Sequence, residues 1–451
     1  MTIMDQAIQA QPGSEDIDLL GRDLEAAQAR YAASNPLSRQ QHEAACLTMP
    51  GGNTRSVLFH EPFPLVIERG EGACLWDRDG HRYVDFIGDF TSGLYGHSDQ
   101  VIRDAIRAAL DAGLSLSGHN MVEQKLATLI TDRFPSIDLV RFTNSGTEAN
   151  LMALGAARIH TGRDKVIVFA GGYHGGLLTF AGPAPLNVPL DFVLGEYNDI
   201  AGTLALIEAH GPDLAAILIE PMQGAAGCIP ATPEFLHALR EAATRSGAVL
   251  IFDEVQTSRL STGGRQLVMG ITPDMTTLGK YIGGGLSFGA FGGSAAIMAM
   301  FDPRDPNHVA HSGTFNNNIL SMAAGAAGLS QVLSAERLRD LNARGEVLRE
   351  RLNALCVEHD AAMQFIGLGS MFTMHPTRAP ISSVADLSAC DPAERDLFYF
   401  YLLSRGIYIA RRGFFALMLP IEDADCDLLV DIVRDYLEQR RLPSDAKSQP
   451  R

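Results

Sequence analysis

Seven short apolar runs, separated by stretches with helical periodicity, occupy the middle of the chain between about residues 91 and 330. Strands that alternate with helices are typical of a parallel sheet covered by helices. In such a sheet, ligands bind beyond the carboxyl ends of the strands, so the polar residues that follow these runs are the candidates for a functional site. The predicted strands are 139–143, 165–169, 192–194, 214–220, 249–253, 275–278 and 290–293.

Smaller elements are predicted before this region. Residues 1 to about 15 are expected to be a frayed tail, and residues 16–33 have apolar positions at helical spacing. Strands are predicted at 63–67 and 73–76, and Asp77-Arg78-Asp79-Gly80 predicts a hairpin turn that returns through 82–86. We therefore expect a small antiparallel element within an N-terminal segment that spans residues 1–90.

The region after residue 330 predicts a small α+β domain, residues 331–451, beside the large α/β domain of residues 91–330. Its final residues, 444–451, are polar and are expected to be a mobile tail. The predicted helices are 335–357, 394–404 and 423–440, and the predicted strands are 363–366, 371–374 and a short one near Tyr408.

The composition excludes several classes of protein. A formal net charge of −17 argues against general affinity for nucleic acid or an anionic membrane. Six scattered cysteines indicate neither a disulfide framework nor a metal site, so a reducing cytoplasm is the expected location. We identify no signal peptide and no apolar stretch long enough to span a membrane.

Two residues point to a specific chemistry. Asp253 ends a run of buried β-formers, where a carboxylate needs a positive partner. Lys280 follows the next predicted strand among several glycines, which let the backbone approach a bulky ligand. A pyridine ring whose nitrogen is protonated by an acid, and whose aldehyde forms a Schiff base with a lysine, requires both groups. The predicted cofactor is therefore pyridoxal 5'-phosphate (PLP), with Lys280 and Asp253 as the catalytic residues.

The segment 142–150 predicts a strand, a tight turn and the start of a helix. Ser145 is suited to cap that helix, and the free N–H groups of Gly146 and Thr147, together with two hydroxyls, form a cradle for a phosphate. A plain helix cap is the alternative. The P-loop pattern GxxxxGK[ST] is absent, so this is not a nucleotide-binding loop of that type.

Residues after other strands complete the predicted cofactor site. Tyr173 is placed to stack on the ring, unless it only fills the core, and His174 is a weaker candidate for a cofactor contact. Glu220 is either a buried acid that orients a neighbour or a simple strand-end carboxylate. Val255 is expected to press on the ring face opposite Tyr173, and Gln256 to donate to the phenolic oxygen. Sheet packing and a surface amide are their alternatives.

Further candidates lie outside the strand ends. Thr314, in a polar loop of residues 311–318, is a second hydroxyl for the phosphate, although helix capping by the neighbouring asparagines also explains that loop. Arg55 and Arg412 are the arginines expected to bind substrate carboxylates. Arg411 is an alternative to Arg412, and a surface ion pair is the alternative for each.

With these residues in place, the chain closely resembles the class III, fold-type I PLP-dependent aminotransferases over about residues 40–440. Within that family it is most similar to the enzymes that act on β-amino acids such as β-phenylalanine. The segments that carry the resemblance are Asn144–Ala149, Gly172–Gly175, Glu220-Pro221, Asp253–Val255 and Gly279-Lys280.

This resemblance implies a seven-stranded, mostly parallel sheet and a homodimer with shared active sites, in which Thr314 reaches the phosphate bound by the other subunit. It also implies transfer of the amino group of an aromatic β-amino acid to 2-oxoglutarate or pyruvate. The alternatives are a mutase like glutamate-1-semialdehyde 2,1-aminomutase, a racemase, a broad amine transaminase, or a PLP-binding protein that has lost catalysis.

Overall fold

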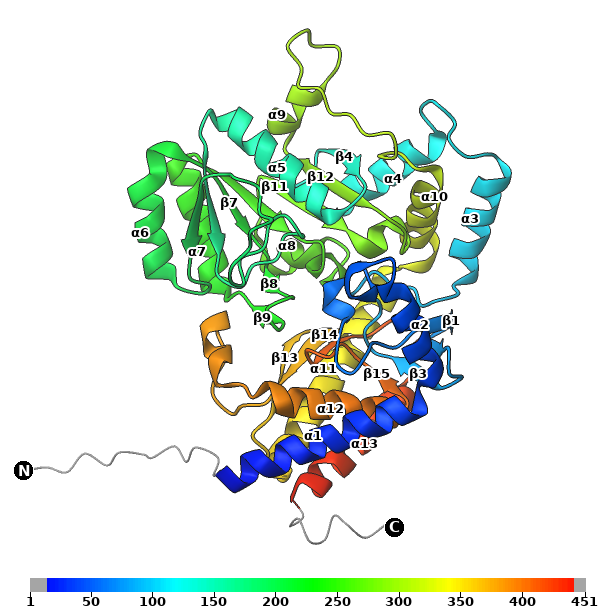
Figure 1. Cartoon of the computed structure of the whole chain (residues 1–451). Helices are drawn as coiled ribbons and strands as arrows, with labels where there is room; N and C mark the ends of the chain where they lie inside the picture. Colours follow the sequence, from blue (N-terminus) through cyan, green and yellow to red (C-terminus); the bar gives the residue numbers. More distant parts are fainter. Residues whose placement is uncertain (1–13, 442–451) are drawn as a thin grey trace, which may run out of the picture.

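The computed structural model describes residues 14–441, which form an upper part built on a large sheet and a lower part built on two small sheets (Figure 1). The first helix, α1 (Ser14–Ser34), begins at Ser14, so the predicted frayed tail is wrong for Ser14 and Glu15. The remainder of that tail and the predicted C-terminal tail, 444–451, lie outside the described residues.

The large sheet has seven strands, as predicted. Five neighbouring strands are parallel, whereas β12 is antiparallel to both of its neighbours. In spatial order the strands are β4 (Leu139–Thr143), β12 (Gly289–Gly293), β11 (Met275–Gly279), β10 (Val249–Asp253), β7 (Leu214–Ile219), β5 (Lys165–Phe169) and β6 (Phe192–Gly195).

Both faces of this sheet are buried, which explains why its strands are continuous apolar runs. Side chains alternate along each strand: Val166 and Val168 pack with α5, while Ile167 and Phe169 pack with the helices on the opposite face. The helices of the upper part are α3 (Gln100–Asp111), α4 (Met121–Thr131), α5 (Gly146–Thr161), α6 (Ile200–His210), α7 (Pro233–Ser246), α8 (Gly264–Met269), α9 (Ala295–Met298) and α10 (Ile319–Ala327).

The lower part joins the two ends of the described chain. The hairpin predicted from Asp77–Gly80 is present, and β3 of that hairpin pairs in parallel with the distant strand β15. This sheet contains β1 (Ile67–Glu71), β2 (Cys74–Asp77), β3 (Arg82–Asp85) and β15 (Ile407–Tyr408). The second small sheet contains β13 (Gln364–Leu368), β14 (Met371–His375) and β16 (Phe414–Ala416).

The strand predicted at 63–67 is wrong, because β1 only begins at Ile67 and continues to Glu71. Pro62 and Pro64 have no N–H group to donate to a neighbouring strand, so the segment that contains them does not join the sheet.

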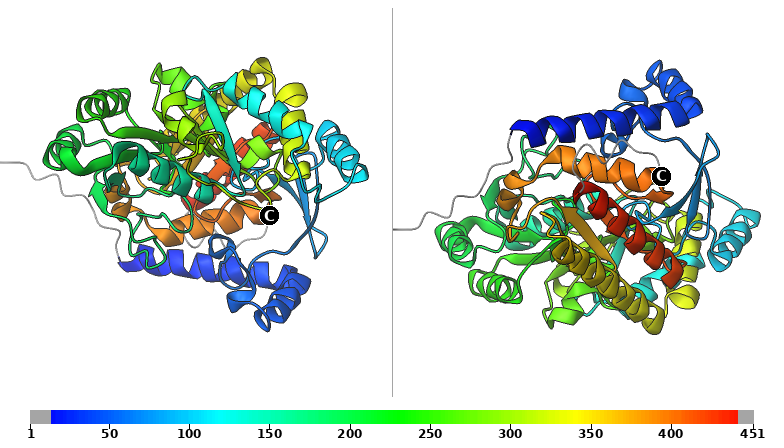
Figure 2. Two further views of the ribbon diagram at one scale, coloured as in Figure 1. Left: turned by 90° about the horizontal axis from the view of Figure 1, so that it is seen from above. Right: turned by 90° about the horizontal axis from the view of Figure 1, so that it is seen from below.

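Helices cover the small sheets. Helix α1 lies along α12 in the views of Figures 1 and 2, and the two are in extensive contact. The remaining helices of this part are α2 (Pro36–Cys46), α11 (Ala335–Glu358), α12 (Pro392–Ser404) and α13 (Asp423–Arg441). Within residues 14–441, no helix is long and apolar enough to cross a membrane.

Candidate active site

Residues that follow the carboxyl ends of β4, β5, β7, β10 and β11 line one cavity of about 280 Å³. The structure therefore brings these predicted residues together at one edge of the sheet. Ten of the residues predicted from sequence line it: Ser145, Gly146, Thr147, Tyr173, His174, Glu220, Asp253, Val255, Gln256 and Lys280. Asn150, Leu286, Ser287 and Phe288 also line it and were not predicted.

Asp253 is buried and held by three hydrogen bonds. Its Oδ2 accepts from Asn150 Nδ2 at 2.8 Å and lies 2.8 Å from His174 Nδ1, while its Oδ1 accepts from the backbone N–H of Val255 at 3.0 Å. Asn150 is fixed in turn, because its Oδ1 accepts from the Thr277 hydroxyl at 2.7 Å. This chain orients the strand-end carboxylate toward the cavity. Asn150 lies five residues after the Ser145 cap, and its role was not evident from the sequence.

Lys280 directly follows β11 and is half-buried, and its backbone φ of 56° is in the left-handed region. Its Nζ donates to the Phe90 carbonyl at 2.5 Å. Burial, and then the positive charge of Arg412, lower the pKa of Lys280 from its ordinary value near 10.5 to about 8. An amine with such a pKa is partly neutral near physiological pH, which suits a nucleophile and a base.

The start of α5 has the geometry expected of an anion site. Ser145 Oγ accepts from the Glu148 N–H at 3.2 Å and caps the helix, which confirms the predicted cap. A side chain at Gly146 would place its Cβ 2.9 Å from Val255 Cγ2, so only glycine allows the backbone to approach the wall of the cavity here. The N–H groups at this positive helix end face the cavity, where an anion is stabilised.

Glu220 is a buried acid that orients a neighbour, which is the first of the two roles predicted for it. Its Oε1 accepts from the backbone N–H of Tyr173 at 2.9 Å, and its Oε2 accepts from Gly224 N–H at 3.2 Å. Burial raises the pKa of Glu220 from 4.5 to about 7. The Tyr173 side chain is 46% exposed and lines the cavity, so it does not fill the core.

The three candidate arginines differ in their surroundings. The Arg412 guanidinium lies 5.1 Å from the centre of the Phe90 ring, and burial lowers its pKa. Arg55 Nη1 forms an ion pair with Asp89 at 2.8 Å, and both side chains are partly exposed. The surface ion pair named as the alternative role of Arg55 is therefore present. Arg411 forms an ion pair with Asp396 at 3.2 Å. Neither Arg55 nor Arg412 lines the cavity itself, but both guanidinium groups lie against Phe90, whose carbonyl contacts Lys280.

Thr314 does not join the cavity of its own chain. It is exposed in the loop between α9 and α10, which projects from the top of Figure 1. Asn318 in the same loop caps α10, because its Oδ1 accepts from the N–H groups of Leu320 and Ser321 at 3.0 and 3.3 Å. The capping role predicted for the asparagines is therefore confirmed for Asn318.

The cavity suits pyridoxal phosphate. Its lining combines the amine of Lys280, the buried carboxylate of Asp253, whose negative charge acts to raise the pKa of that amine, and a helix N-terminus for the phosphate. Among the described residues, the buried Gln256 Oε1 atom has no hydrogen-bond partner, so it is available to accept from a donor group of a ligand. A Cβ at Gly175 would collide with Thr147 Oγ1 at 2.0 Å, so the loop after β5 packs directly on the phosphate cradle.

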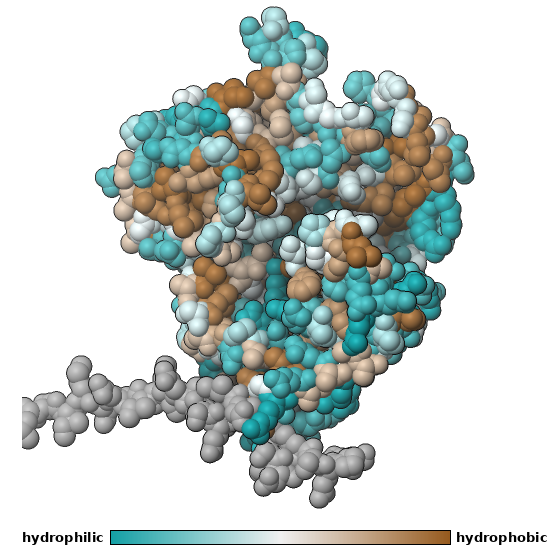
Figure 3. All heavy atoms as spheres, viewed as in Figure 1, coloured by the Kyte–Doolittle hydropathy of each residue, from teal (hydrophilic) through white to brown (hydrophobic). Residues whose placement is uncertain are grey.

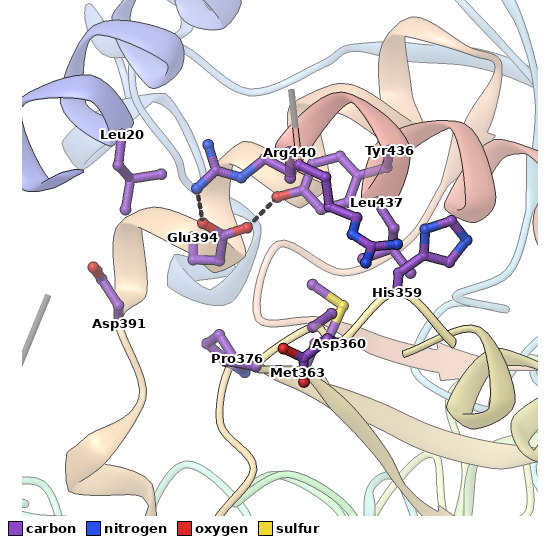
Figure 4. A pocket seen from close by; sticks show the side chains of 13 residues that line it. Leu20, His359, Asp360, Met363, Pro376, Asp391, Glu394, Tyr436, Leu437 and Arg440 are labelled. Atoms are coloured by element: carbon purple, nitrogen blue, oxygen red, sulfur yellow. Dashed lines mark hydrogen bonds and ion pairs between the residues drawn. The ribbon is translucent and has the colours of Figure 1, made fainter. Parts of the chain in front are cut away.

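A second, larger cavity of about 370 Å³ lies in the lower part among α1, α12 and α13. Figure 4 shows Glu394 at its edge, which accepts hydrogen bonds from the Tyr436 hydroxyl and from Arg440. None of the residues predicted for catalysis lies there. Lys280 and Asp253 both line the smaller cavity instead.

Comparison with known proteins agrees with this geometry. Residues 58–182 and 194–437 match the family model described as aminotransferase class-III. The chain is 56% identical, over 90% of its length and 94% of the other protein, to a beta-phenylalanine transaminase from Variovorax paradoxus. It is 38% identical, over 87% of its length and 96% of the other protein, to a glutamate-1-semialdehyde 2,1-aminomutase from Nitratidesulfovibrio vulgaris.

Solved structures give the same result. A beta-phenylalanine aminotransferase from Variovorax paradoxus superposes with a TM-score of 0.92 at 55% identity, covering 93% of this chain and 97% of the other. A structure described as a transaminase with PLP bound superposes with a TM-score of 0.83 at 32% identity, covering 90% of this chain and 98% of the other.

Proposed function

The chain belongs to the class III aminotransferases and is a PLP-dependent enzyme, and from that premise we propose that it transfers the amino group of an aromatic β-amino acid to a keto acid such as 2-oxoglutarate or pyruvate. The 56% identity to a beta-phenylalanine transaminase over most of both chains supports this donor class. The observation that carries the chemistry is that Lys280 and Asp253 line the same cavity.

The residues of this chain divide the work. Bound pyridoxal phosphate supplies an aldehyde that accepts the amino group and a ring that draws electrons from the neighbouring carbon. Lys280 would hold the cofactor at rest, and its freed amine would take the proton from the amine-bearing carbon of the donor and deliver it to the cofactor. Asp253 keeps the ring nitrogen protonated, because a buried anion held by His174 and Asn150 favours a positive partner.

Other predicted residues bind the phosphate, the ring and the phenolic oxygen of the cofactor. Ser145, Gly146 and Thr147 bind the phosphate at the α5 N-terminus, while Tyr173 and Val255 enclose the ring. Gln256 donates to the phenolic oxygen through its side-chain NH₂ group, and its position in the lining of the cavity supports this role.

Arg55 and Arg412 bind the carboxylates of donor and acceptor. Arg412 is the stronger candidate, because burial lowers its pKa and its Nε has no hydrogen-bond partner among residues 14–441. Its positive charge also lowers the pKa of Lys280. A desolvated guanidinium gains more from a carboxylate than an exposed one does.

We also propose a homodimer with shared active sites. Exposed apolar side chains on α3, on α4 and in the two loops beside them support it, and brown side chains gather in this upper half of Figure 3. The two loops are joined by a hydrogen bond of 3.0 Å from Asn120 Nδ2 to the Asn317 carbonyl. These apolar residues are Leu110, Leu114, Leu116, Met121 and Phe315.

Mixed dimers test the shared site. If Thr314 serves the partner's phosphate, equal mixing of Lys280→Ala and Thr314→Ala subunits restores fully competent sites in about a quarter of the total, because each mixed dimer carries one site without either change. Activity that never exceeds the sum of the two parents contradicts sharing, and light scattering reports the oligomeric state directly.

Two further assignments accompany this function. We propose that residues 91–330 form the PLP-binding domain and that the segments before and after it form the small domain, which the pairing of β3 with β15 supports. We propose a cytoplasmic location, supported by six cysteines that are all free thiols.

Incubation of the purified, PLP-loaded protein with racemic β-phenylalanine and either keto acid tests the function. We expect amino transfer that requires the keto acid and is faster than with an α-amino acid or a simple amine. Conversion of the donor without any added acceptor would instead identify an aminomutase or racemase, the alternative favoured by the 38% identity to glutamate-1-semialdehyde 2,1-aminomutase.

A further inference from the structure

Four consecutive residues beside the active site have backbone φ angles in the left-handed region. These are Gly88, Asp89, Phe90 and Thr91, with φ of 51°, 43°, 53° and 78°. Glycine adopts this conformation freely and aspartate tolerates it, whereas the bulky Phe90 and the β-branched Thr91 are held in an unfavourable geometry. Such strain persists where the surrounding structure enforces it, and it concentrates at functional sites.

Hydrogen bonds enforce the turn from both ends. Asp85 Oδ1 accepts from the N–H groups of Ile87 and Gly88 at 2.7 and 3.1 Å, and the Gly88 carbonyl accepts from Gly93 N–H at 2.9 Å. The Phe86 carbonyl accepts from the Ala416 N–H at 2.6 Å. The turn is thereby fixed to β16, the strand that follows Arg412 in the sequence.

The turn gives Phe90 two separate tasks. Its backbone carbonyl accepts from Lys280 Nζ, while its ring lies beneath two cations. The guanidinium carbons of Arg55 and Arg412 are 5.6 and 5.1 Å from the ring centre. The ring also stacks on Phe414, with the ring centres 6.1 Å apart and the planes inclined by 19°. A buried ring in this position attracts both guanidinium groups through its negative faces.

Asp89 fixes one of these cations from a second side. Its Oδ1 pairs with Arg55 Nη1 at 2.8 Å, and its Oδ2 accepts from the Ser92 hydroxyl at 2.9 Å. Arg55 therefore has little freedom, although nearly half of its side chain is exposed. Asp89 and Phe90, which are consecutive in this strained turn, thus hold Arg55, the arginine predicted from the sequence to bind a substrate carboxylate.

We propose that Phe90 is a specificity-determining residue, whose ring holds the Arg55 and Arg412 guanidinium groups where they select ligands that carry a carboxylate. This inference rests on the proposed function, because it takes these arginines as the carboxylate-binding groups. The contact with Lys280 uses a backbone atom. Replacement of the ring therefore changes carboxylate recognition and leaves the reacting amine in place.

Hydrocinnamate tests this directly, because it has the aryl group and carboxylate of β-phenylalanine but no amine and undergoes no reaction. Titration calorimetry on the PLP-loaded enzyme compares wild type, Phe90→Leu and Phe90→Tyr. We expect Phe90→Leu to weaken binding about tenfold, since two cation–π contacts are lost, and Phe90→Tyr to bind within about twofold of wild type. The absorbance of the bound cofactor and the thermal unfolding midpoint report whether each variant is assembled.

Turnover separates a role in specificity from a structural role. With β-phenylalanine, Phe90→Leu is expected to raise KM about tenfold with kcat within about twofold. With α-methylbenzylamine, which replaces the carboxymethyl group by a methyl group, and with the keto acid at saturating concentration, the KM for the amine and kcat remain near wild type.

The possible results have distinct meanings. Equal loss with both donors, or unchanged hydrocinnamate binding and unchanged KM in Phe90→Leu, overturns the inference while the proposed function stands. A wild-type enzyme that neither binds hydrocinnamate nor transaminates β-phenylalanine overturns the proposed function itself.

Discussion

His174 Nδ1 lies 2.8 Å from Asp253 Oδ2, and both side chains are buried. An ionised carboxylate only accepts hydrogen bonds, so the proton between them is on the histidine. Because Asn150 donates to the same oxygen, the carboxylate cannot rotate away from the cavity. The acid that the sequence placed at the strand end is therefore held in position by two residues from other elements.

Replacement of His174 tests the importance of this contact. We expect His174→Ala to lower kcat about tenfold to a hundredfold and to weaken cofactor binding, because a buried charged acceptor loses one of its donors. Steady-state kinetics and titration of the cofactor-free protein with PLP measure both effects. His237→Ala, an exposed histidine on α7, is the matched control and should behave as wild type. A fully active His174→Ala enzyme would show that Asn150 alone suffices.

The Lys280 amine should react at a lower pH than an ordinary lysine. Since burial and Arg412 lower its pKa to about 8, its neutral form predominates above that pH. In cofactor-free protein, the rate at which a small amine-reactive reagent labels Lys280 should rise with pH through a midpoint near 8, measured by mass spectrometry of the peptide. Arg412→Met removes a nearby positive charge and should move this midpoint upward. A midpoint near 10.5 in wild type would contradict the buried, cation-flanked position.

The two adjacent arginines should differ sharply as carboxylate ligands. Arg412→Ala is expected to raise KM for β-phenylalanine about tenfold to a hundredfold, because a charge-assisted hydrogen bond to a carboxylate is lost. Arg411→Ala is expected to change KM less than about twofold, since that residue pairs with Asp396. Kinetics of the two variants side by side decide the assignment, and the reverse order of effects would make Arg411 the binding residue.

Glu220 makes stability depend on pH. Its folded-state pKa, raised to about 7 by burial, lies above the unfolded value near 4.5, so its contribution is fully present below 4.5 and is lost as pH rises through 7. Glu220→Gln cannot ionise. The free energy of unfolding of the variant minus that of wild type should therefore increase by about 2 kcal/mol from about pH 5 to about pH 8.

Chemical denaturation at the two pH values measures this difference. The backbone hydrogen bond that glutamine cannot accept lowers stability equally at both pH values, so it cancels in the comparison. Glu234→Gln, at an exposed position on α7, is the control and should show no such trend. A Glu220→Gln difference that is independent of pH would mean that Glu220 is ionised throughout this range.

Much of the large sheet was predictable, because each strand is a short apolar run that ends at a polar or glycine-containing turn. The runs predicted at 139–143, 165–169 and 249–253 have the bounds of β4, β5 and β10. The error at 63–67 arose because its apolar residues resemble a strand while Pro62 and Pro64 prevent pairing. Hydrophobic pattern alone does not report which N–H groups are missing.

The site was predictable as far as its residues follow strands directly. Lys280, Asp253 and Ser145 lie at strand ends, and parallel strands bring those ends to one edge. Asn150 and Phe90 were missed, because neither follows a strand of the large sheet. Their roles come from contacts with residues more than a hundred positions away in the sequence, such as Asp253 and Lys280.

By itself, the sequence determined the order of strands and helices, the chemical groups available at the strand ends and, through its motifs, the cofactor. These properties are local, since they depend on periodicity and on residue type at short spacing. Only the tertiary structure decided that Asp253 is locked by His174 and Asn150, that Glu220 holds Tyr173, and that a strained turn brings Phe90 to two arginines and the lysine. These relationships join segments from different elements, and they exist only once packing has excluded water from between them.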